Sequence, residues 1–326
     1  MGLGKIYQKF VLSSPIIEVV IRCLYWNNVK HLMRFRQSST EAVSKKEDIK
    51  SDFGKILQFL AKTGIKQEDI IVLHSSYASV ANTGLSAEEI IDKLLDLVGP
   101  KGTLAMPAIR QFPEEGQGDE YLLNYISDRC KEKETVYDVY RSTVSSGLLP
   151  FTLMRYDDAE ISRFPLNPLV AVGFQAFEMM KLNLDGEKPS AHGPNSSWAF
   201  CAKENAWNVG IGVSIKDYLT MFHITQETAE WPVRDEEWYF DRKFIIKEGR
   251  RLSSLTIKER QHKWTKYLAE SNFYNDLHKA NVIKSTIIDG VEVHVCRSQD
   301  MLDFIANQKN PTYPYLIPRK YFKSGI

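Results

Sequence analysis

The sequence predicts an α/β fold in which helices flank a mixed central sheet (α/β/α), with an antiparallel C-terminal portion. Two observations carry this prediction. A helical pattern over residues 49–60 and a β-branched run at 70–73 are followed by a second helix-then-strand pair over 86–107, which is the element order of α/β layer folds. Near the C-terminus, residues 244–246 and 291–295 show the pattern of antiparallel strands.

The first helices have recognisable ends. Apolar residues recur at helical spacing from residue 49, and Gly64 is expected to end that helix. Ser86 is expected to cap the second helix, with Glu89 three residues later completing a capping box. That helix stops at Gly99, before a predicted strand at 103–107.

The middle and C-terminal elements are predicted from the same patterns. Residues 148–155 are expected to be helical, and 169–173 and 207–213 to be central strands. Residues 217–230 and a charged amphipathic stretch at 256–280 are expected to be helices.

The sequence predicts an N-terminal appendage, residues 1–47, and one main domain, residues 48–326. Residues 10–26 are apolar, basic residues follow them, and residues 37–44 are typical of a linker. The appendage is expected to pack on the body or on a partner subunit of a homo-oligomer. The alternative is a membrane-surface contact through residues 1–36, in which basic residues meet lipid headgroups.

Composition excludes several classes of protein. The 326 residues carry a net charge of +1, which does not indicate nucleic-acid binding. The four cysteines are far apart and form no C-x-x-C pair, so no cysteine zinc site is expected and a reducing, cytoplasmic compartment fits. The sequence has no run of about 18 consecutive apolar residues, so no membrane-spanning helix is expected. Phosphate-loop, dinucleotide-binding and nucleophile-elbow motifs are missing.

His74, Ser75 and Ser76 follow the predicted strand at 70–73. Ligands of open α/β sheets gather at the carboxyl ends of strands. The hydroxyls and backbone amides there suit contact with a thioester carbonyl or a phosphate. A polar turn in which serine bonds its own backbone is the alternative.

His223 and Glu227 are the candidate catalytic pair. On a helix they would lie on one face, four residues apart, and a carboxylate beside an imidazole supports a general base. A structural, hydrogen-bonded histidine is the alternative. The segment lacks the second histidine of H-E-x-x-H zinc sites, so we expect no metal.

A third candidate is the turn at residues 192–198, in which His192 precedes Gly-Pro-Asn and two serines. Ser196 or Ser197 suits a helix cap, and a capped turn is the simpler interpretation. His192 is a candidate for lining a pocket.

Taken in chain order, these motifs resemble those of the aminoglycoside 3-N-acetyltransferase family. The resemblance covers about residues 50–250. It rests on V-x-H-S-S ending at Ser76, the specific string V-G-P-K-G-T-L-A-M-P at 98–107, Y-D with R-S-T and G-L-L-P at 137–150, P-x-x-x-x-x-x-x-G at 165–173, G-P-N-S-S-W at 193–198, and I-G-V with T-x-x-H ending at His223.

The resemblance implies an acyl-CoA-dependent N-acyltransferase with a fold different from the common GNAT acetyltransferases. The donor would be acetyl-CoA or a hydroxyacyl-CoA, and the acceptor the amino group of a small-molecule amino sugar. His223 would take the amine proton in a direct transfer without metal. His74, Ser75 and Ser76 would contact CoA or the thioester oxygen, and Asp138, Asn167, His192 and Gln226 would contact the acceptor.

The sequence departs from the family at informative positions. Gln226 stands where the family commonly has Glu, and Phe164 and Asn167 stand where many members have His. Partial loss of ionisable pocket residues favours a nucleotide-linked amino sugar of cell-surface polysaccharide assembly over an aminoglycoside antibiotic. The alternatives are an aminoglycoside 3-N-acetyltransferase, a non-catalytic nucleotide-sugar-binding relative, and a hydrolase using Ser75 or Ser76 with His223.

Overall fold

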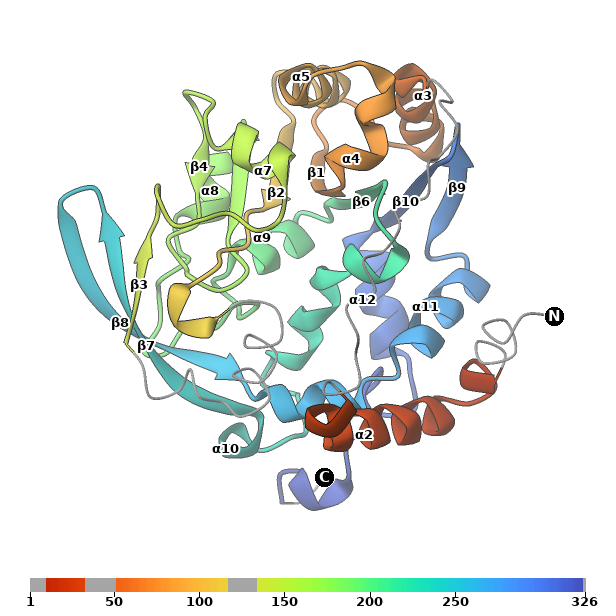
Figure 1. The fold of residues 1–326 in the computed structure, drawn as a ribbon, viewed down its shortest axis with the longest axis vertical. Helices are drawn as coiled ribbons and strands as arrows, with labels where there is room; N and C mark the ends of the chain where they lie inside the picture. The colour runs from red at the N-terminus through yellow and green to blue at the C-terminus, as the bar shows by residue number, and fades with distance from the viewer. Residues whose placement is uncertain (1–9, 33–50, 117–133, 325–326) are drawn as a thin grey trace.

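A central seven-stranded sheet and a smaller three-stranded sheet beside it dominate the computed structural model, which describes residues 10–32, 51–116 and 134–324 (Figure 1). The strands of the large sheet are β1 (Ile70–Ser75), β2 (Thr103–Pro107), β4 (Glu160–Ile161), β5 (Leu169–Gly173), β6 (Trp207–Ile211), β9 (Lys284–Ile288) and β10 (Val291–Arg297). Those of the small sheet are β3 (Thr135–Asp138), β7 (Tyr239–Glu248) and β8 (Arg251–Arg260).

The large sheet is mixed, in the order β4-β5-β2-β1-β6-β10-β9. Its centre is parallel, because β1 runs parallel to both β2 and β6, while β5 and β10 run antiparallel to their neighbours. The carboxyl ends of the three parallel strands therefore meet at one edge, where ligands of such sheets bind. In the small sheet, β7 and β8 form an antiparallel hairpin. The predicted α/β class with an antiparallel C-terminal portion is confirmed.

Helices cover both faces of the large sheet, as the alternation along its strands requires. In β1, Ile71 and Leu73 point to one face, and Ile70 and Val72 to the other. The first face packs against α3 (Phe53–Thr63), α5 (Ala87–Val98) and α7 (Leu148–Leu153). The second packs against α8 (Ala176–Met180), α9 (Ser197–Lys203), α11 (Glu270–Lys279) and α12 (Ser298–Ala306). The short helices α4 (Tyr77–Val80) and α10 (Asp235–Trp238) connect strands.

The predicted helix ends of the N-terminal half are confirmed. Gly64 ends α3 with a φ of 121°, a backbone conformation that favours glycine. Ser86 caps α5, and the reciprocal bond from the Ser86 backbone amide to Glu89 completes the capping box.

One predicted helix is wrong, and another is right only in its C-terminal part. Residues 217–230 form no α-helix but the 3-10 segments η5 (Ile215–Asp217) and η6 (Thr220–Gln226). The hydroxyl of Thr225 donates to the carbonyl of Phe222, a side-chain bond that competes with a continuing α-helix.

Residues 256–280 divide between the end of β8, the 3-10 segment η7 (His262–Tyr267) and α11. Leu255 pairs with Phe244 across the hairpin. This strand pairing outweighs the helical pattern that the sequence alone offers.

The first described helix, α2 (Pro15–Leu32), packs on α11 and η7, as Figure 1 shows near the bottom of the view. Its Glu18 is buried and accepts hydrogen bonds from the backbone amides of Ser271 and Asn272, at distances of 2.7 and 3.0 Å. Arg22 pairs with Glu270 at 3.0 Å. A carboxylate at the amino end of a helix is favourable, so Glu18 holds α2 to the body.

Parts of the N-terminal predictions lie outside the described residues: the boundary between 47 and 48, the linker at 37–44, and the basic Arg34 and Arg36. A subunit or membrane-surface contact through residues 1–36 stays a prediction. None of the helices in the described ranges is long and apolar enough to cross a membrane. The described cysteines, Cys23, Cys201 and Cys296, are free thiols.

Candidate active site

A cavity of about 270 Å³ lies between the carboxyl edge of the large sheet and the end of β8. The strand order explains why distant segments meet there: the loop after β2 and the loop before β5 share this edge, because the two strands are antiparallel neighbours. The lining residues are Ile109, Arg110, Phe112, Glu115, Pro165, Leu166, Asn167, Ala191, His192, His223, Glu227, Lys258, Glu259, Arg260 and His262.

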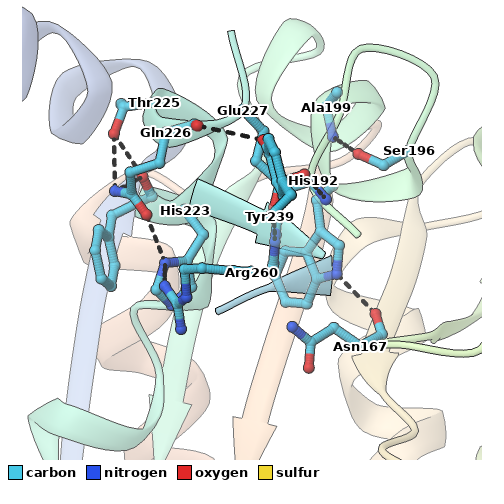
Figure 2. Close-up of polar contacts among 12 residues, drawn as sticks. Asn167, His192, Ser196, Ala199, His223, Thr225, Gln226, Glu227, Tyr239 and Arg260 are labelled. Carbon is cyan, nitrogen blue, oxygen red and sulfur yellow. Dashed lines mark hydrogen bonds and ion pairs between the residues drawn. The ribbon is translucent and has the colours of Figure 1, made fainter. Parts of the chain in front are cut away.

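His223 lies in this cavity with Gln226 beside it, not Glu227. The Nδ1 of His223 is 2.8 Å from Oε1 of Gln226 (Figure 2). In a 3-10 helix, residues three apart lie directly above one another, so the 3-10 form of η6 brings Gln226 to the imidazole. The predicted pairing of His223 with Glu227 assumed α-helical spacing and is wrong.

The same Nδ1 atom also faces a guanidinium. Nη1 of Arg260 is 2.9 Å from Nδ1 of His223 and 2.6 Å from the hydroxyl of Tyr315. The amide nitrogen of Gln226 donates to the carbonyl of Phe222 and to Thr225, which turns its oxygen toward His223. Gln226 can accept a proton from Nδ1, whereas the guanidinium of Arg260 can only donate to it, so the two contacts require opposite tautomers of His223. The tautomer bonded to Gln226 leaves Nε2 as the basic nitrogen, and the reaction proposed below uses this one.

His223 is held in its neutral form. Burial lowers the pKa of His223, and the charge of Arg260, joined by that of His192 when its ring is protonated, lowers it further, well below the usual range. The hydrogen bond with Gln226 opposes this shift but does not reverse it. His223 can therefore accept a proton at neutral pH but does not retain one.

Glu227 pairs with His192, which also lines the cavity. Its Oε1 is 3.4 Å from Nδ1 of His192, and its Oε2 accepts a 2.9 Å hydrogen bond from the backbone amide of His192. Both side chains are buried, at 7% and 4% exposed. The Nε2 of His192 has no hydrogen-bond partner among the described residues. Figure 2 shows His192 with Glu227, and beside them His223 with Gln226 and Arg260.

Glu227 is ionised in this setting. Burial alone raises the pKa of its carboxyl group, but the hydrogen bonds from His192, its charge when the ring is protonated, and the hydroxyl of Ser190 outweigh burial. The pKa of Glu227 therefore lies below its usual range. Of the three histidines that line the cavity, His192 and His223 have ring centroids 5.2 Å apart and differ in character: His192 lies beside a carboxylate and His223 beside a guanidinium.

The remaining carboxylates of the cavity serve a buried arginine. Arg242, only 1% exposed, contacts Glu115 at 3.0 Å and Glu259 at 3.1 Å. Glu259 also contacts Nε2 of His262 at 3.2 Å. Because a buried arginine needs such partners, these carboxylates support the wall of the cavity.

A second cavity of about 210 Å³ reaches His223 from another side. It shares His223 and Arg260 with the first, and Arg22 and Lys216 add cationic groups to its lining. His223 therefore lies where two cavities meet, as a base serving two substrates would.

The predicted CoA-contacting residues lie at the end of β1, outside the linings of these two cavities. His74 is buried, with its ring centroid 6.0 Å from that of Trp198, and burial lowers the pKa of His74 to about 4. The backbone amide of Ser76 donates to the carbonyl of Ile211. The expectation that this amide is available for a thioester oxygen is therefore wrong, while contacts of CoA with the Ser75 and Ser76 hydroxyls stay a prediction.

Of the four predicted acceptor-contacting residues, three lie at or beside the cavity and one does not. Asn167 lines the cavity, held in a left-handed turn with φ of 48°, and its carbonyl accepts a bond from Trp198. His192 also lines it, and Gln226 is buried behind His223. Asp138 does not line it; its carboxylate pairs with Lys247 at 3.0 Å and bonds the turn after β3.

Sequence reasoning missed Arg260, the cationic neighbour of His223. It lies at the end of β8, in the stretch mistaken for a helix, and the alternation of Leu255 and Ile257 with polar residues was the available signal. Among the described residues, no group of three or more His, Cys, Asp or Glu is placed to hold a metal ion.

Comparison with known proteins bears on this site. The sequence model of the family described as aminoglycoside 3-N-acetyltransferase matches residues 72–308. The aminoglycoside N(3)-acetyltransferase IX of Micromonospora chalcea is 25% identical over 211 residues, which cover 61% of this chain and 69% of that protein.

Solved structures share the fold. The aminoglycoside acetyltransferase AAC(3)-Xa superposes with a TM-score of 0.61 and 18% identity, covering 77% of this chain and 90% of that one. AAC-IIIb, solved as a binary complex with CoASH, gives 0.60 and 17% identity over 78% and 94% of the two chains. AAC-VIa, solved with sisomicin, gives 0.61 and 15% identity over 78% and 95%.

Proposed function

The chain belongs to the aminoglycoside 3-N-acetyltransferase family and is an acyl-CoA-dependent N-acyltransferase, and we propose that it acetylates an amino group of an aminoglycoside-type amino sugar. One observation carries the proposal at the level of residues. The neutral imidazole of His223 lies where two cavities meet, so a donor in one and an acceptor in the other would share a single base.

The chemistry is a direct transfer. The free amine attacks the thioester carbon, the N–C bond forms, and Nε2 of His223 accepts the proton from nitrogen. Collapse of the intermediate breaks the C–S bond, and the thiolate takes up the proton from His223. Gln226 supports this by holding the opposite nitrogen of the ring.

The named relatives favour an aminoglycoside-type acceptor over the nucleotide-linked sugar that the sequence favoured. The named relative in M. chalcea is an aminoglycoside N-acetyltransferase, and AAC-VIa was solved with sisomicin. The family match includes His223 and the cavity, so the acceptor class of the relatives is the first one to test.

A nucleotide-linked amino sugar is the second candidate, and a specific observation favours it. The carboxylates that line the cavity all contact cationic or histidine side chains of the protein itself: Glu115 and Glu259 contact Arg242, and Glu227 contacts His192. A polycation gains less from carboxylates that are already paired, whereas Arg260 in both cavities suits an anionic acceptor.

The test is a steady-state assay of thiol release with acetyl-CoA and a panel of aminoglycosides and nucleotide-linked amino sugars, with product masses measured. We expect an N-acetylated aminoglycoside at kcat/KM of about 10⁴ M⁻¹s⁻¹ or more, the low end for a natural substrate. His223→Asn should lower kcat by about 10²–10⁴, the range for a general base.

His278→Asn, a change on α11 outside both cavities, is the matched control and should leave kcat unchanged. Turnover of nucleotide-linked sugars alone would transfer the assignment to the second candidate. Sugar binding without turnover of any acceptor would indicate a non-catalytic relative and contradict the proposal.

A further inference from the structure

The proposed reaction must remove two protons from the acceptor nitrogen. Alkyl amines have reference pKa values of about 8 to 10, so an amino sugar arrives largely as an ammonium ion at neutral pH. One proton must leave before the nitrogen can attack, and a second leaves as the amide forms. The thiolate takes one of these protons, and the other must reach solvent.

His223 is poorly suited to hold the first proton. Its imidazolium would lie beside the guanidinium of Arg260, whose Nη1 is 2.9 Å from Nδ1. Two like charges at that distance in a buried site repel, and Gln226 supplies no compensating charge. His223 is better suited to hold a proton briefly, between its removal from the amine and its delivery to the thiolate.

The pair of His192 and Glu227 has the opposite character. Glu227 is bonded to the backbone amide of His192 and faces Nδ1 of its ring, so the carboxylate is fixed in place. Protonation of His192 at Nε2 would turn a buried anion beside a neutral ring into a neutral ion pair. Nε2 is buried and has no partner among the described residues, and His192 lines the cavity.

The other charged groups around the cavity in the described parts of the chain do not offer this arrangement. His262 also contacts a carboxylate, that of Glu259, but Glu259 is shared with Arg242, whose charge disfavours a second cation. The remaining titratable or charged groups near His192 are His223 and Arg260, Tyr239 near Glu227, Lys258 paired with Asp235, Glu115 paired with Arg242, and Arg110 bonded to backbone carbonyls.

We propose, resting on the acyl transfer proposed above, that His192 backed by Glu227 removes the first proton from the acceptor's ammonium group, and that His223 takes the second during transfer. The N–H bond of the ammonium breaks as Nε2 of His192 gains the proton, and the free amine then attacks the thioester carbon. The thiolate leaves with the proton from His223. His192 releases its proton to solvent, so one proton is produced per turnover.

The test is the pH dependence of kcat/KM for the acceptor in Glu227→Gln and His192→Gln. At neutral pH both variants should lose about 10²-fold, the lower end of the effect of a positioned acid or base. The loss should shrink toward about pH 9.5, where the acceptor is already a free amine. The KM for acetyl-CoA should not change.

Two comparisons define the result. His223→Asn should lose rate at every pH, and Glu230→Gln, an exposed glutamate three residues beyond Glu227, should follow the wild-type profile. A loss in Glu227→Gln and His192→Gln that is equal at all pH values, or no loss, would overturn the proposal. Absence of transfer by the wild-type protein would instead refute the proposed function.

A second measurement guards against a folding defect. An acceptor analogue whose amine is only weakly basic needs no first deprotonation at neutral pH. Within one preparation of Glu227→Gln, the ratio of rates on the analogue and on the natural acceptor should rise about 10²-fold above the wild-type ratio. A folding defect lowers both rates equally, so an unchanged ratio would also overturn the proposal.

Discussion

At the scale of residues, the site depends on which partner each histidine has. His223 has the neutral Gln226 and the cationic Arg260, while His192 has the anionic Glu227. The charges beside the two imidazoles have opposite signs, so neighbouring rings are suited to different proton transfers.

Gln226→Glu tests this account of His223. A carboxylate 2.8 Å from Nδ1 would stabilise the imidazolium and raise the pKa of His223 from its depressed position. Because only the neutral ring accepts a proton, the pH below which kcat falls should move upward by about one unit. The measurement is the pH profile of kcat at saturating acceptor and acetyl-CoA.

Gln299→Glu, an exposed change at the start of α12, is the matched control for added negative charge. Its profile should coincide with that of the wild type. If the acidic limb of Gln226→Glu stays in place or moves to lower pH, the proposed relation between Gln226 and the basicity of His223 is wrong.

The sequence predicted His223 but not which side chains contact it. His223 was found through its motif, but its partner depended on helix type, because 3-10 spacing selects Gln226 and α spacing would select Glu227. Nothing in the local sequence separates the two forms. Arg260 could not be placed for another reason. Alternation over residues 255–257 indicated its strand, but its position beside His223 depends on a contact between segments 37 positions apart, which no local pattern encodes.

At the scale of elements, local signals were sufficient where they were complete. The capping box at Ser86 and the glycine at the end of α3 fixed those helix ends, because both act within one turn. Packing of α2 on the body was one of the two expectations, but its point of attachment was not predictable, since it depends on Glu18 reaching the amino end of α11, more than 250 positions along the chain.

Glu18→Ala tests that attachment. It removes the acceptor of two backbone amides and of the Asn272 side chain, and leaving such buried donors unsatisfied should cost about 3 kcal/mol of docking free energy. We expect faster hydrogen exchange in α2 and in the first turn of α11, with exchange in the central strands unchanged. Mass spectrometry of the exchanged peptides measures both.

Glu88→Ala removes an exposed glutamate from the first turn of α5 and serves as the control. Its exchange should match the wild type. Slow exchange of α2 in Glu18→Ala would show that Arg22 and the apolar contacts hold this helix without Glu18.

At the scale of the whole molecule, the two sheets and the helices between them place one base between two cavities. The loops after β2 and before β5 supply one wall of the first cavity, and β8 supplies Arg260 from the small sheet. Nδ1 of His223 contacts Gln226 and Arg260 rather than Ser75 or Ser76, so the described residues give no support to a serine nucleophile activated by this histidine. Direct transfer, as proposed, requires donor and acceptor to be bound together.

The most direct test of this central claim is an initial-velocity study in which acetyl-CoA and the acceptor are varied against each other. Direct transfer through a complex of both substrates predicts intersecting lines in the reciprocal plot, and unmodified protein after incubation with acetyl-CoA alone. Parallel lines, together with an acetyl group on Ser75 or Ser76 formed as fast as turnover, would contradict it.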